Sequence, residues 1–406
     1  MSTVISGATP PPAGVTVPEG FRAAAVASGI KPDRLDLALI VADAECTAAG
    51  VFTSNLARAA PVLVSREHVA SGRARAVVVN AGCANAGTGE GGVKDAREMA
   101  ETVAYTVGCR PEEVLVASTG VIGVRLPMEK VRAGIADAAR RISRHAGASA
   151  ARAIMTTDTR PKEVAVEFPV GEARCVVGGM AKGSGMIAPD LATLLAFFTT
   201  DAAVTAPLLR RALGEAVGES LNRITVDGCT STNDCALVLA SGARPAPAIA
   251  GEGPDYDAFR KALTEAARGL AEMLVRDGEG ATRIACVRVE GARTTAEADR
   301  VARTVAESPL VKTALHGGDP NWGRILAAVG RAGVPLEVSR VSIYIGDVHV
   351  AERGAAREYD EKAAAAAMQE DPVRFLVRLG EGEASGWLWT SDLSHGYVDV
   401  NAHYRS

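Results

Sequence analysis

Hydrophobic and polar residues follow two different periods along the first third of the chain. Short apolar runs bounded by turn residues predict strands at residues 37–41, 48–52, 76–80 and 114–117. Longer segments, in which apolar residues recur every three or four positions, predict amphipathic helices at residues 94–107 and 128–144. Because strands and helices alternate, the pattern indicates an α/β fold.

The same two periods continue through the rest of the chain. Alternation predicts a strand with Val164, Val166 and Phe168 on one face, a strand at 284–289 and a hairpin at 341–351. Helical spacing predicts helices at residues 207–221, around 259–274 and at 295–306, where Thr294 and Glu297 have capping-box spacing. Residues 243–254 form the only stretch with the composition of a linker.

Residues 178–201, GGMAKGSGMIAPDLATLLAFFTTD, join a glycine-rich loop to an apolar run. Glycines directly after the short β-rich piece at 175–177 allow a sharp turn or a close approach to a ligand. Pro189 and Asp190 predict a helix start, since proline suits the first helical position and an acid suits the positive helix end. The leucines and phenylalanines that follow leave almost no polar face. We therefore expect a buried helix that contains Thr193.

Two interpretations of Thr193 stay open on the residues alone. A threonine inside a helix commonly donates its hydroxyl hydrogen bond to a carbonyl one turn earlier, which is a purely structural role. Alternatively, Thr193 is a nucleophile released as a new N-terminus by self-cleavage after Ala192, with its own α-amine as the base. An α-amine has a pKa near roughly 8, so a useful fraction is unprotonated at neutral pH.

Composition and charge narrow the classes of function. The 406 residues are 48% hydrophobic and 23% charged, which is usual for a folded globular protein with a sizeable core. The net charge of −4 comes with scattered Lys and Arg residues rather than a basic stripe, which argues against a nucleic-acid partner. The sequence shows no leader-like segment and no run of about 18 uncharged apolar residues. We therefore expect a cytoplasmic protein without a membrane partner.

The cysteines and histidines lack the spacing of metal sites. Seven cysteines are widely spaced without a CxxC pair, and the six histidines form no HxxxH or HExxH pattern. Such cysteines fit small buried side chains in a reducing compartment better than disulfides. We expect no structural or catalytic metal.

Several loops contain candidate site residues, each with a plain structural alternative. Residues 80–92, NAGCANAGTGEGG, are either a long turn or a loop that brings backbone close to a ligand. Thr119 and Gly120 follow a predicted strand, where a hydroxyl beside a backbone N–H supplies the parts of an oxyanion hole, although turns of this composition are common. Lys182, in an apolar glycine-rich loop, either reaches water or pairs with an anion.

Acidic and C-terminal candidates have similar alternatives. Asp158 in the segment 154–158, IMTTD, suits turn chemistry. Glu279 lies between glycines after a predicted helix, so it is either a solvated turn acid or a group that approaches a ligand. The last residues include Asn401 and Ser406, and a tail of this kind can simply dock as an edge.

Together these segments resemble the ornithine acetyltransferase family, also called glutamate N-acetyltransferases. The specific strings are IMTTD, KGSGMIAPDLATLLAFFTTD from Lys182 onward, TSTND at 230–234 and DPNWGRI at 319–325. The similarity is specific over residues 117–406 and looser over 20–92. This chain departs from the family pattern at Cys83, Gly87, Cys229 and Cys235.

The resemblance implies transfer of an acetyl group from N-acetylornithine to glutamate through an acetyl-Thr193 intermediate. Acetyl-CoA is a second donor in some members, and no bound cofactor is implied. Self-cleavage between Ala192 and Thr193 would give an α chain, 1–192, and a β chain, 193–406, intertwined in sheets sandwiched by helices and assembled as α₂β₂ or larger. The implied oxyanion hole is Thr119 and Gly120. The implied substrate-binding residues are Thr156, Lys182, Thr193, Glu279, Asn401 and Ser406.

Three hypotheses from other classes compete with this one. Residues 183–188, GSGMIA, fit the G-x-G-x-x-G/A dinucleotide fingerprint after a strand, which indicates an NAD-dependent oxidoreductase. A related amidase or aminopeptidase would use the same threonine with water as the acceptor. A non-enzymatic binding or scaffold protein would use every glycine only as a turn.

Overall fold

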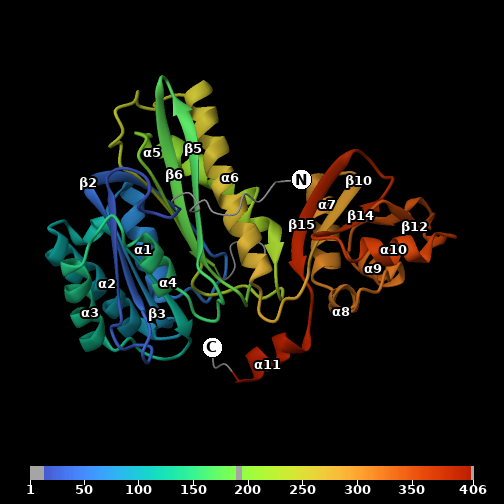
Figure 1. Ribbon diagram of the computed structural model, residues 1–406, viewed down its shortest axis with the longest axis horizontal. Coiled ribbons are helices and arrows are strands. Elements are labelled where there is room, and N and C mark those ends of the chain that lie inside the picture. The colour runs from blue at the N-terminus through green and yellow to red at the C-terminus, as the bar shows by residue number, and fades with distance from the viewer. Residues whose placement is uncertain (1–12, 189–193, 404–406) are drawn as a thin grey trace, which may run out of the picture.

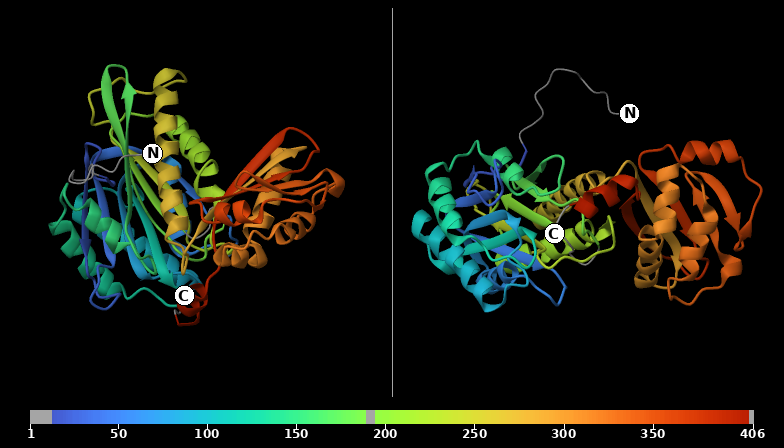
Figure 2. Two further views of the ribbon diagram at one scale, coloured as in Figure 1. Left: turned by 45° about the vertical axis from the view of Figure 1, so that its right-hand side comes forward. Right: turned by 90° about the horizontal axis from the view of Figure 1, so that it is seen from below.

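The computed structural model describes residues 13–188 and 194–403, which form two units built on separate sheets (Figures 1 and 2). The blue, green and yellow elements of Figure 1 make up the first unit, and the orange and red elements make up most of the second. Within these residues, no helix is both long and apolar enough to cross a bilayer.

The first unit contains an eight-stranded mixed sheet. Along the sheet the strands lie in the order β4-β3-β2-β9-β7-β6-β5, and β1 pairs with β2 off this path. The pairs β3–β4 and β7–β9 are parallel, and the other pairs are antiparallel. The strands are β1 (Phe21–Val26), β2 (Leu37–Phe52), β3 (Arg73–Cys83), β4 (Val114–Val121), β5 (Lys162–Val170), β6 (Ala173–Lys182), β7 (Leu195–Thr200) and β9 (Cys235–Ala240).

Helices cover this sheet in layers. One face of β2, β3 and β4 packs against α1 (Ala60–His68), α2 (Gly89–Val107) and α3 (Met128–Arg140). The opposite faces of these strands share an inner core with α4 (Gly147–Ala153) and with one face of β7 and β9. The other face of β7 and β9 packs against α5 (Ala206–Gly218) and α6 (Pro254–Arg276). The expected α/β fold, with helices sandwiching sheet layers, is confirmed.

The expected helix in the apolar run after the glycine-rich loop is wrong where the structure describes it. Leu195–Thr200 is strand β7, between β6 and β9 near the middle of the sheet. Leu195 and Phe197 face the inner core, whereas Ala196 and Phe198 face α5 and α6. A strand buried on both faces needs apolar residues at every position, so its sequence looks like that of a buried helix.

A second difference concerns the strands expected at 37–41 and 48–52, which are parts of one long strand, β2. Its register with β3 shifts between Val41 and Cys46, where Asp43, Ala44 and Glu45 are exposed. The first half pairs with β1 and β3, and the second half pairs with β9. These three exposed residues mark an irregularity within the strand rather than its end.

The second unit contains a seven-stranded sheet in the order β13-β12-β11-β14-β10-β15-β8. Its short strand β8 (Ile224–Thr225) belongs to the chain between α5 and β9, and so links the two units. The other strands are β10 (Ile284–Ala292), β11 (Ser342–Ile345), β12 (Val348–Glu352), β13 (Ala355–Ala356), β14 (Val373–Arg378) and β15 (Ala384–Ser391). The helices of this unit are α7 (Thr295–Ala306), α8 (Pro309–Gly317), α9 (Trp322–Gly330) and α10 (Glu361–Ala367).

Several sequence predictions for this half of the chain are confirmed. Ala285, Val287 and Val289 of β10 are buried in one core with α7 and α9. The Thr294 hydroxyl caps α7 by accepting the Glu297 backbone N–H. The hairpin of β11 and β12 turns at Gly346, as expected. The last described element, α11 (His395–His403), leaves the second unit and lies against the first (Figures 1 and 2).

Candidate active site

A pocket opens where the ends of β4 and β6 meet the loops that follow α4, α6 and β8 and the helix α11. Each of these segments therefore brings a different part of the sequence to one place. The pocket is lined by Ala84, Thr119, Gly120, Ile122, Thr156, Thr157, Lys182, Gly185, Met186, Ser231, Thr232, Asn233, Glu279 and Asn401.

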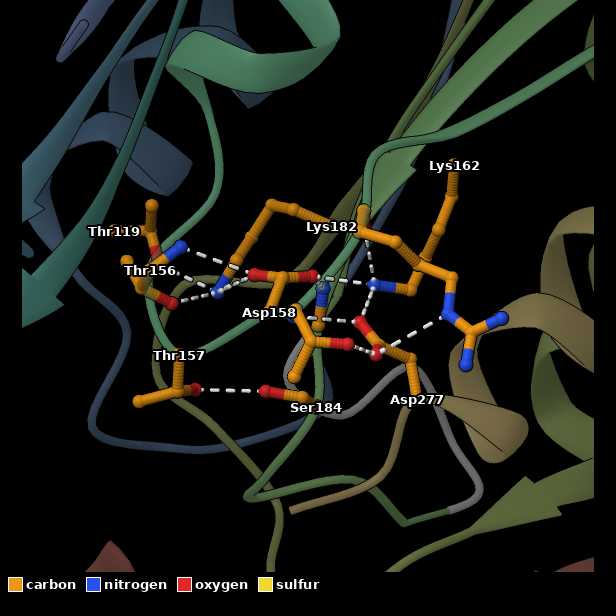
Figure 3. Close-up of polar contacts among 11 residues, drawn as sticks. Thr119, Thr156, Thr157, Asp158, Lys162, Lys182, Ser184 and Asp277 are labelled. Atoms are coloured by element: carbon orange, nitrogen blue, oxygen red, sulfur yellow. Dashed lines mark hydrogen bonds and ion pairs between the residues drawn. The ribbon is translucent and has the colours of Figure 1, made fainter. Parts of the chain in front are cut away.

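Lys182, at the end of β6, lies at the centre of the polar contacts in this pocket (Figure 3). Its Nζ donates hydrogen bonds to Thr156 Oγ1 at 2.7 Å and to Thr119 Oγ1 at 3.2 Å. Asp158 Oδ2 is 4.0 Å from the same nitrogen. An ammonium group only donates, so both threonine oxygens accept, and each hydroxyl keeps its own hydrogen for another acceptor.

Burial and neighbouring charges act against each other at Lys182. The side chain is only 4% exposed, and this burial lowers its pKa, while Asp158 raises it. Burial alone would raise the pKa of Asp158, but Lys182, Lys162 and the Gly183 N–H together hold it at about 2. Asp158 is therefore a carboxylate at neutral pH, beside a cationic group in a poorly solvated site.

Thr119 and Gly120, in the last part of β4, lie side by side at the pocket wall. Gly120 has a φ of 130°, and a Cβ there would lie 2.3 Å from the backbone of Gly82 in β3, so no side chain fits. The Asn233 side chain donates to the carbonyls of Ser118 and Ala84 and fixes the two segments against each other. The Thr119 hydroxyl, held by Lys182, is therefore rigidly placed at the pocket wall.

Glu279 approaches the pocket from the turn after α6. Its Oε2 accepts a hydrogen bond from Asn401 Nδ2 of α11 at 2.8 Å, and its backbone N–H donates to the Ser184 carbonyl at 2.7 Å. A Cβ on Gly185 would lie 2.2 Å from the Glu279 carboxylate, so a side chain there would displace the carboxylate from its present position. These contacts join the glycine-rich loop, the α6 turn and the C-terminal helix.

Asp227 fixes the glycine-rich loop from the other side. Its carboxylate accepts the backbone N–H groups of Met186 and Ile187 and, at 3.3 Å, the hydroxyl of Tyr397 in α11. Burial raises the pKa of Asp227, which the backbone donors oppose. The loop is therefore held by carboxylates of the protein itself.

This arrangement contradicts the dinucleotide hypothesis for residues 183–188. In a dinucleotide site, free backbone N–H groups and the start of a helix face the pyrophosphate. Here the N–H groups of Gly183, Met186 and Ile187 already donate to protein carboxylates. The next described element is strand β7 rather than a helix.

Six of the expected site residues line this one pocket: Thr119, Gly120, Thr156, Lys182, Glu279 and Asn401. Ala192 and Thr193, the expected cleavage site and nucleophile, and Ser406 lie outside the described residues. Among the residues that are described, no three His, Cys, Asp or Glu side chains gather as metal ligands would. All seven cysteines have free thiols.

The buried charges behind the pocket are hard to recognise from the sequence. The local sequence around Asp158 suits a turn, and no motif includes Lys162 or Asp277. Yet Lys162 is 0% exposed and donates to Asp158 at 2.7 Å and to Asp277 at 2.6 Å. A lysine at an inward position of an otherwise alternating strand was the only available signal, since lysine is almost never fully buried without a partner.

Comparisons with known proteins identify the family of this chain. The ArgJ family model matches residues 22–406. An arginine biosynthesis bifunctional protein ArgJ from Symbiobacterium thermophilum is 49% identical over 396 residues, 97% of this chain and 98% of that protein. Its counterpart from Dehalococcoides mccartyi is 46% identical over 399 residues, 98% of each chain. A solved ornithine acetyltransferase from Mycobacterium tuberculosis, complexed with ornithine, shows 44% identity, covers 44% of this chain and 95% of that chain, and has a TM-score of 0.39.

The chain is therefore an α/β acyltransferase rather than a scaffold protein or an oxidoreductase. More specifically, it belongs to the ArgJ family, which confirms the resemblance found in the sequence.

Proposed function

We propose that this enzyme transfers the acetyl group of N-acetylornithine to glutamate in arginine biosynthesis, with Thr193 as the nucleophile. One observation carries the proposal: the Lys182 ammonium, two threonine hydroxyls and the Glu279 carboxylate line one pocket. A cation suits the carboxylate that both amino acids share, and an anion suits an amino group. Family membership supports the same assignment.

The proposed chemistry has two balanced half-reactions. The Thr193 hydroxyl oxygen attacks the acetyl carbonyl, its proton passes to the free α-amine of Thr193, and the C–N bond of the amide breaks as ornithine takes up a proton. The acetyl group is then an ester on Thr193. The α-amine of glutamate attacks this ester, and N-acetylglutamate leaves as the threonine hydroxyl is restored. Donor and acceptor bind in turn, so the order is ping-pong.

Both half-reactions develop negative charge on the acetyl oxygen. The Thr119 hydroxyl accepts from Lys182, so its hydrogen is available to donate to that oxygen, with the Gly120 N–H as the second donor. A cation behind the hydroxyl strengthens it as a donor. A donor of this kind contributes about 3 kcal/mol to transition-state stabilisation.

Self-cleavage after Ala192 fits the sheet order. The proposed α chain contains β2 and β6, and the proposed β chain contains β7 and β9. In the sheet β6 pairs with β7, and β2 pairs with β9 along six residues each. Two fragments joined by such ladders and a shared core stay together after the peptide bond is cut. This supports one intertwined protomer, which we propose assembles as α₂β₂ or larger.

Acetyl-CoA is proposed as a second, slower donor. A thioester needs only to bring its acetyl group to Thr193, so the same nucleophile and oxyanion donors serve. We propose that the enzyme needs no bound cofactor and no metal, because the α-amine of Thr193 supplies the base. Its seven free thiols favour a reducing compartment, and hence the cytoplasm.

The test supplies purified enzyme with glutamate and one acetyl donor at a time, and follows N-acetylglutamate by mass spectrometry. We expect fast formation from N-acetylornithine and slower formation from acetyl-CoA. Lys94→Met, at an exposed position of α2, serves as a control that leaves both rates unchanged. If N-acetylglutamate forms from acetyl-CoA but not from N-acetylornithine, the proposed main activity is wrong. Release of acetate instead of N-acetylglutamate would favour the amidase alternative.

A further inference from the structure

A buried ion cluster lies directly behind the pocket. Lys162, the first residue of β5, is 0% exposed, and its Nζ lies between Asp158 at 2.7 Å and Asp277 at 2.6 Å (Figure 3). Asp158 and Asp277 are also almost fully buried. Moving three charges out of water is costly, so a hydrophobic set of the same volume would serve stability as well or better. The cluster therefore needs a reason other than stability.

Asp158 connects the cluster to one side of the pocket. Its Oδ1 accepts from Lys162 and from the Gly183 N–H at 2.7 Å, and its Oδ2 accepts from the Thr156 N–H at 3.0 Å. The same Oδ2 is 4.0 Å from Lys182 Nζ. One carboxylate thus fixes the backbone of Thr156, the start of the glycine-rich loop and the ammonium between them.

Asp277 connects the cluster to the other side. It is the C-cap residue of α6, two positions before Glu279. Its Oδ2 accepts from Lys162 and from the Thr159 N–H at 3.0 Å, and its other oxygen accepts the Thr159 hydroxyl. Through Lys162, the turn that carries Glu279 is tied to the segment that carries Thr156 and Lys182.

We propose that Asp158, Lys162 and Asp277 form a buried positioning triad that sets the distance and charge balance between Lys182 and Glu279, and so determines how the enzyme binds amino-acid carboxylates. None of the three lines the active-site pocket. The inference rests on the proposed function of Lys182 as the carboxylate-binding cation.

Lys162 and Asp158 form one ion pair, but removing one or the other should shift the pKa of Lys182 in opposite directions. Burial is the main cause that lowers the pKa of Lys182. Among the charged groups that face it, Asp158, Asp234 and Glu279 raise this pKa and Lys162 lowers it, and Lys31 lies nearby. Removing Lys162 therefore keeps Lys182 protonated to higher pH. Removing the charge of Asp158 makes Lys182 lose its proton at lower pH.

The experiment compares full-length Lys162→Met and Asp158→Asn with wild type, measuring kcat and KM for N-acetylornithine across pH. We expect KM to rise at least tenfold in both variants. The alkaline limb of kcat/KM should move to higher pH in Lys162→Met and to lower pH in Asp158→Asn. A purely structural role would not shift the limb in opposite directions. Lys94→Met and Asp257→Asn, both at exposed helix positions, are the matched controls.

If Lys162→Met does not fold, the charge-balanced double variant Lys162→Met/Asp277→Asn takes its place. The double variant should fold and keep the raised KM. Its alkaline limb of kcat/KM should move to higher pH, but by less than expected for Lys162→Met. If the folded variants show a wild-type KM and an unshifted alkaline limb of kcat/KM, the proposed role of the triad is wrong, although the proposed function would still hold. Absence of transfer in wild type would instead contradict the proposed function, and calorimetric titration of L-glutamate across pH would then test the same opposite shifts.

Discussion

The two sheet units bury a lysine in different ways. In the first unit, Lys162 lies between two carboxylates, within 2.7 Å of each. In the second, Lys312 of α8 is 3% exposed and donates to the Thr390 hydroxyl at 2.9 Å and to the Ser391 carbonyl. Burial therefore lowers the pKa of Lys312 to about 8, although Asp392, Asp227 and Glu307 raise it from a greater distance. The buried lysine behind the pocket, Lys162, is thus paired with carboxylates. The buried lysine of the second unit, Lys312, is held by a hydroxyl and a backbone carbonyl.

The largest expected effect follows from removing the cation of the first unit. Lys162→Met removes the cation between Asp158 and Asp277 and leaves them only the longer contacts with Lys182 at 4.0 Å and Arg160 at 3.6 Å. This should cost about 3–5 kcal/mol in the free energy of unfolding. Urea unfolding at pH 7 measures this loss. A loss below about 1 kcal/mol would show that the ion cluster does not depend on its cation more strongly than the Lys312 site does.

The pH dependence of this cluster has a defined sign. The pKa of Asp158 is about 2 in the folded protein, below the value of about 3.9 in an unfolded chain. The stabilisation from this group is therefore present above pH ~4 and is lost as pH falls from ~4 to ~2. Asp158→Asn should remove this part of the acid sensitivity, as followed by acid titration of the wild type and the variant.

The second effect separates catalysis from stability within the first unit. Thr119→Ala removes one of the two proposed oxyanion donors, so the transfer rate should fall by about a hundredfold, equivalent to about 2.7 kcal/mol. The free energy of unfolding should fall by less than in Lys162→Met, because Lys182 keeps its hydrogen bond to Thr156. Steady-state kinetics and urea unfolding of one preparation test both halves. An unchanged kcat would remove Thr119 from the mechanism.

The third effect concerns the lysine of the second unit. Between pH 8 and 10 the unfolded chain keeps a proton that folded Lys312 has released, so this group makes the free energy of unfolding rise with pH. Over that range, wild type should gain about 2 kcal/mol relative to Lys312→Met. Acetyl transfer at pH 7 should be nearly unchanged in the variant. A constant stability difference across this range would contradict the lowered pKa.

The smallest effect is a helix cap in the second unit. Thr294→Ala removes the oxygen that accepts the Glu297 N–H and should lower the free energy of unfolding by about 1 kcal/mol. Activity should not change, since α7 contributes no side chain to the pocket. Loss of activity at wild-type stability would show that the second unit acts on the site through more than α11.

Periodicity predicted those elements whose two faces differ in polarity. The helix α6 and the strand β10 have one buried side, and their spacing was visible in the sequence. The sequence pattern predicts a helix where strand β7 lies, because both faces of the strand are buried and the alternation of polar and apolar residues is lost. In β2, three exposed residues interrupt the apolar pattern, so the sequence predicts two strands. Pairing with β3 and β9 makes them one continuous strand.

The site was predictable only in part, for a related reason. Short strings indicated Thr156, Lys182 and Glu279, and these do line one pocket. The pairing of Lys162 with Asp277 spans 115 residues, so no local pattern reports it. Charge balance in a buried cluster is a property of the folded chain, and the contacts of each member are needed to recognise it.

The central claim, covalent acetyl transfer at Thr193, is tested most directly by intact-mass spectrometry. The enzyme is incubated with N-acetylornithine without glutamate and denatured before analysis. The account predicts two fragments, 1–192 and 193–406, with one acetyl group on the second that disappears as N-acetylglutamate forms when glutamate is added. A single uncleaved chain of 41.8 kDa in active enzyme, or transfer without any acetylated fragment, would contradict it.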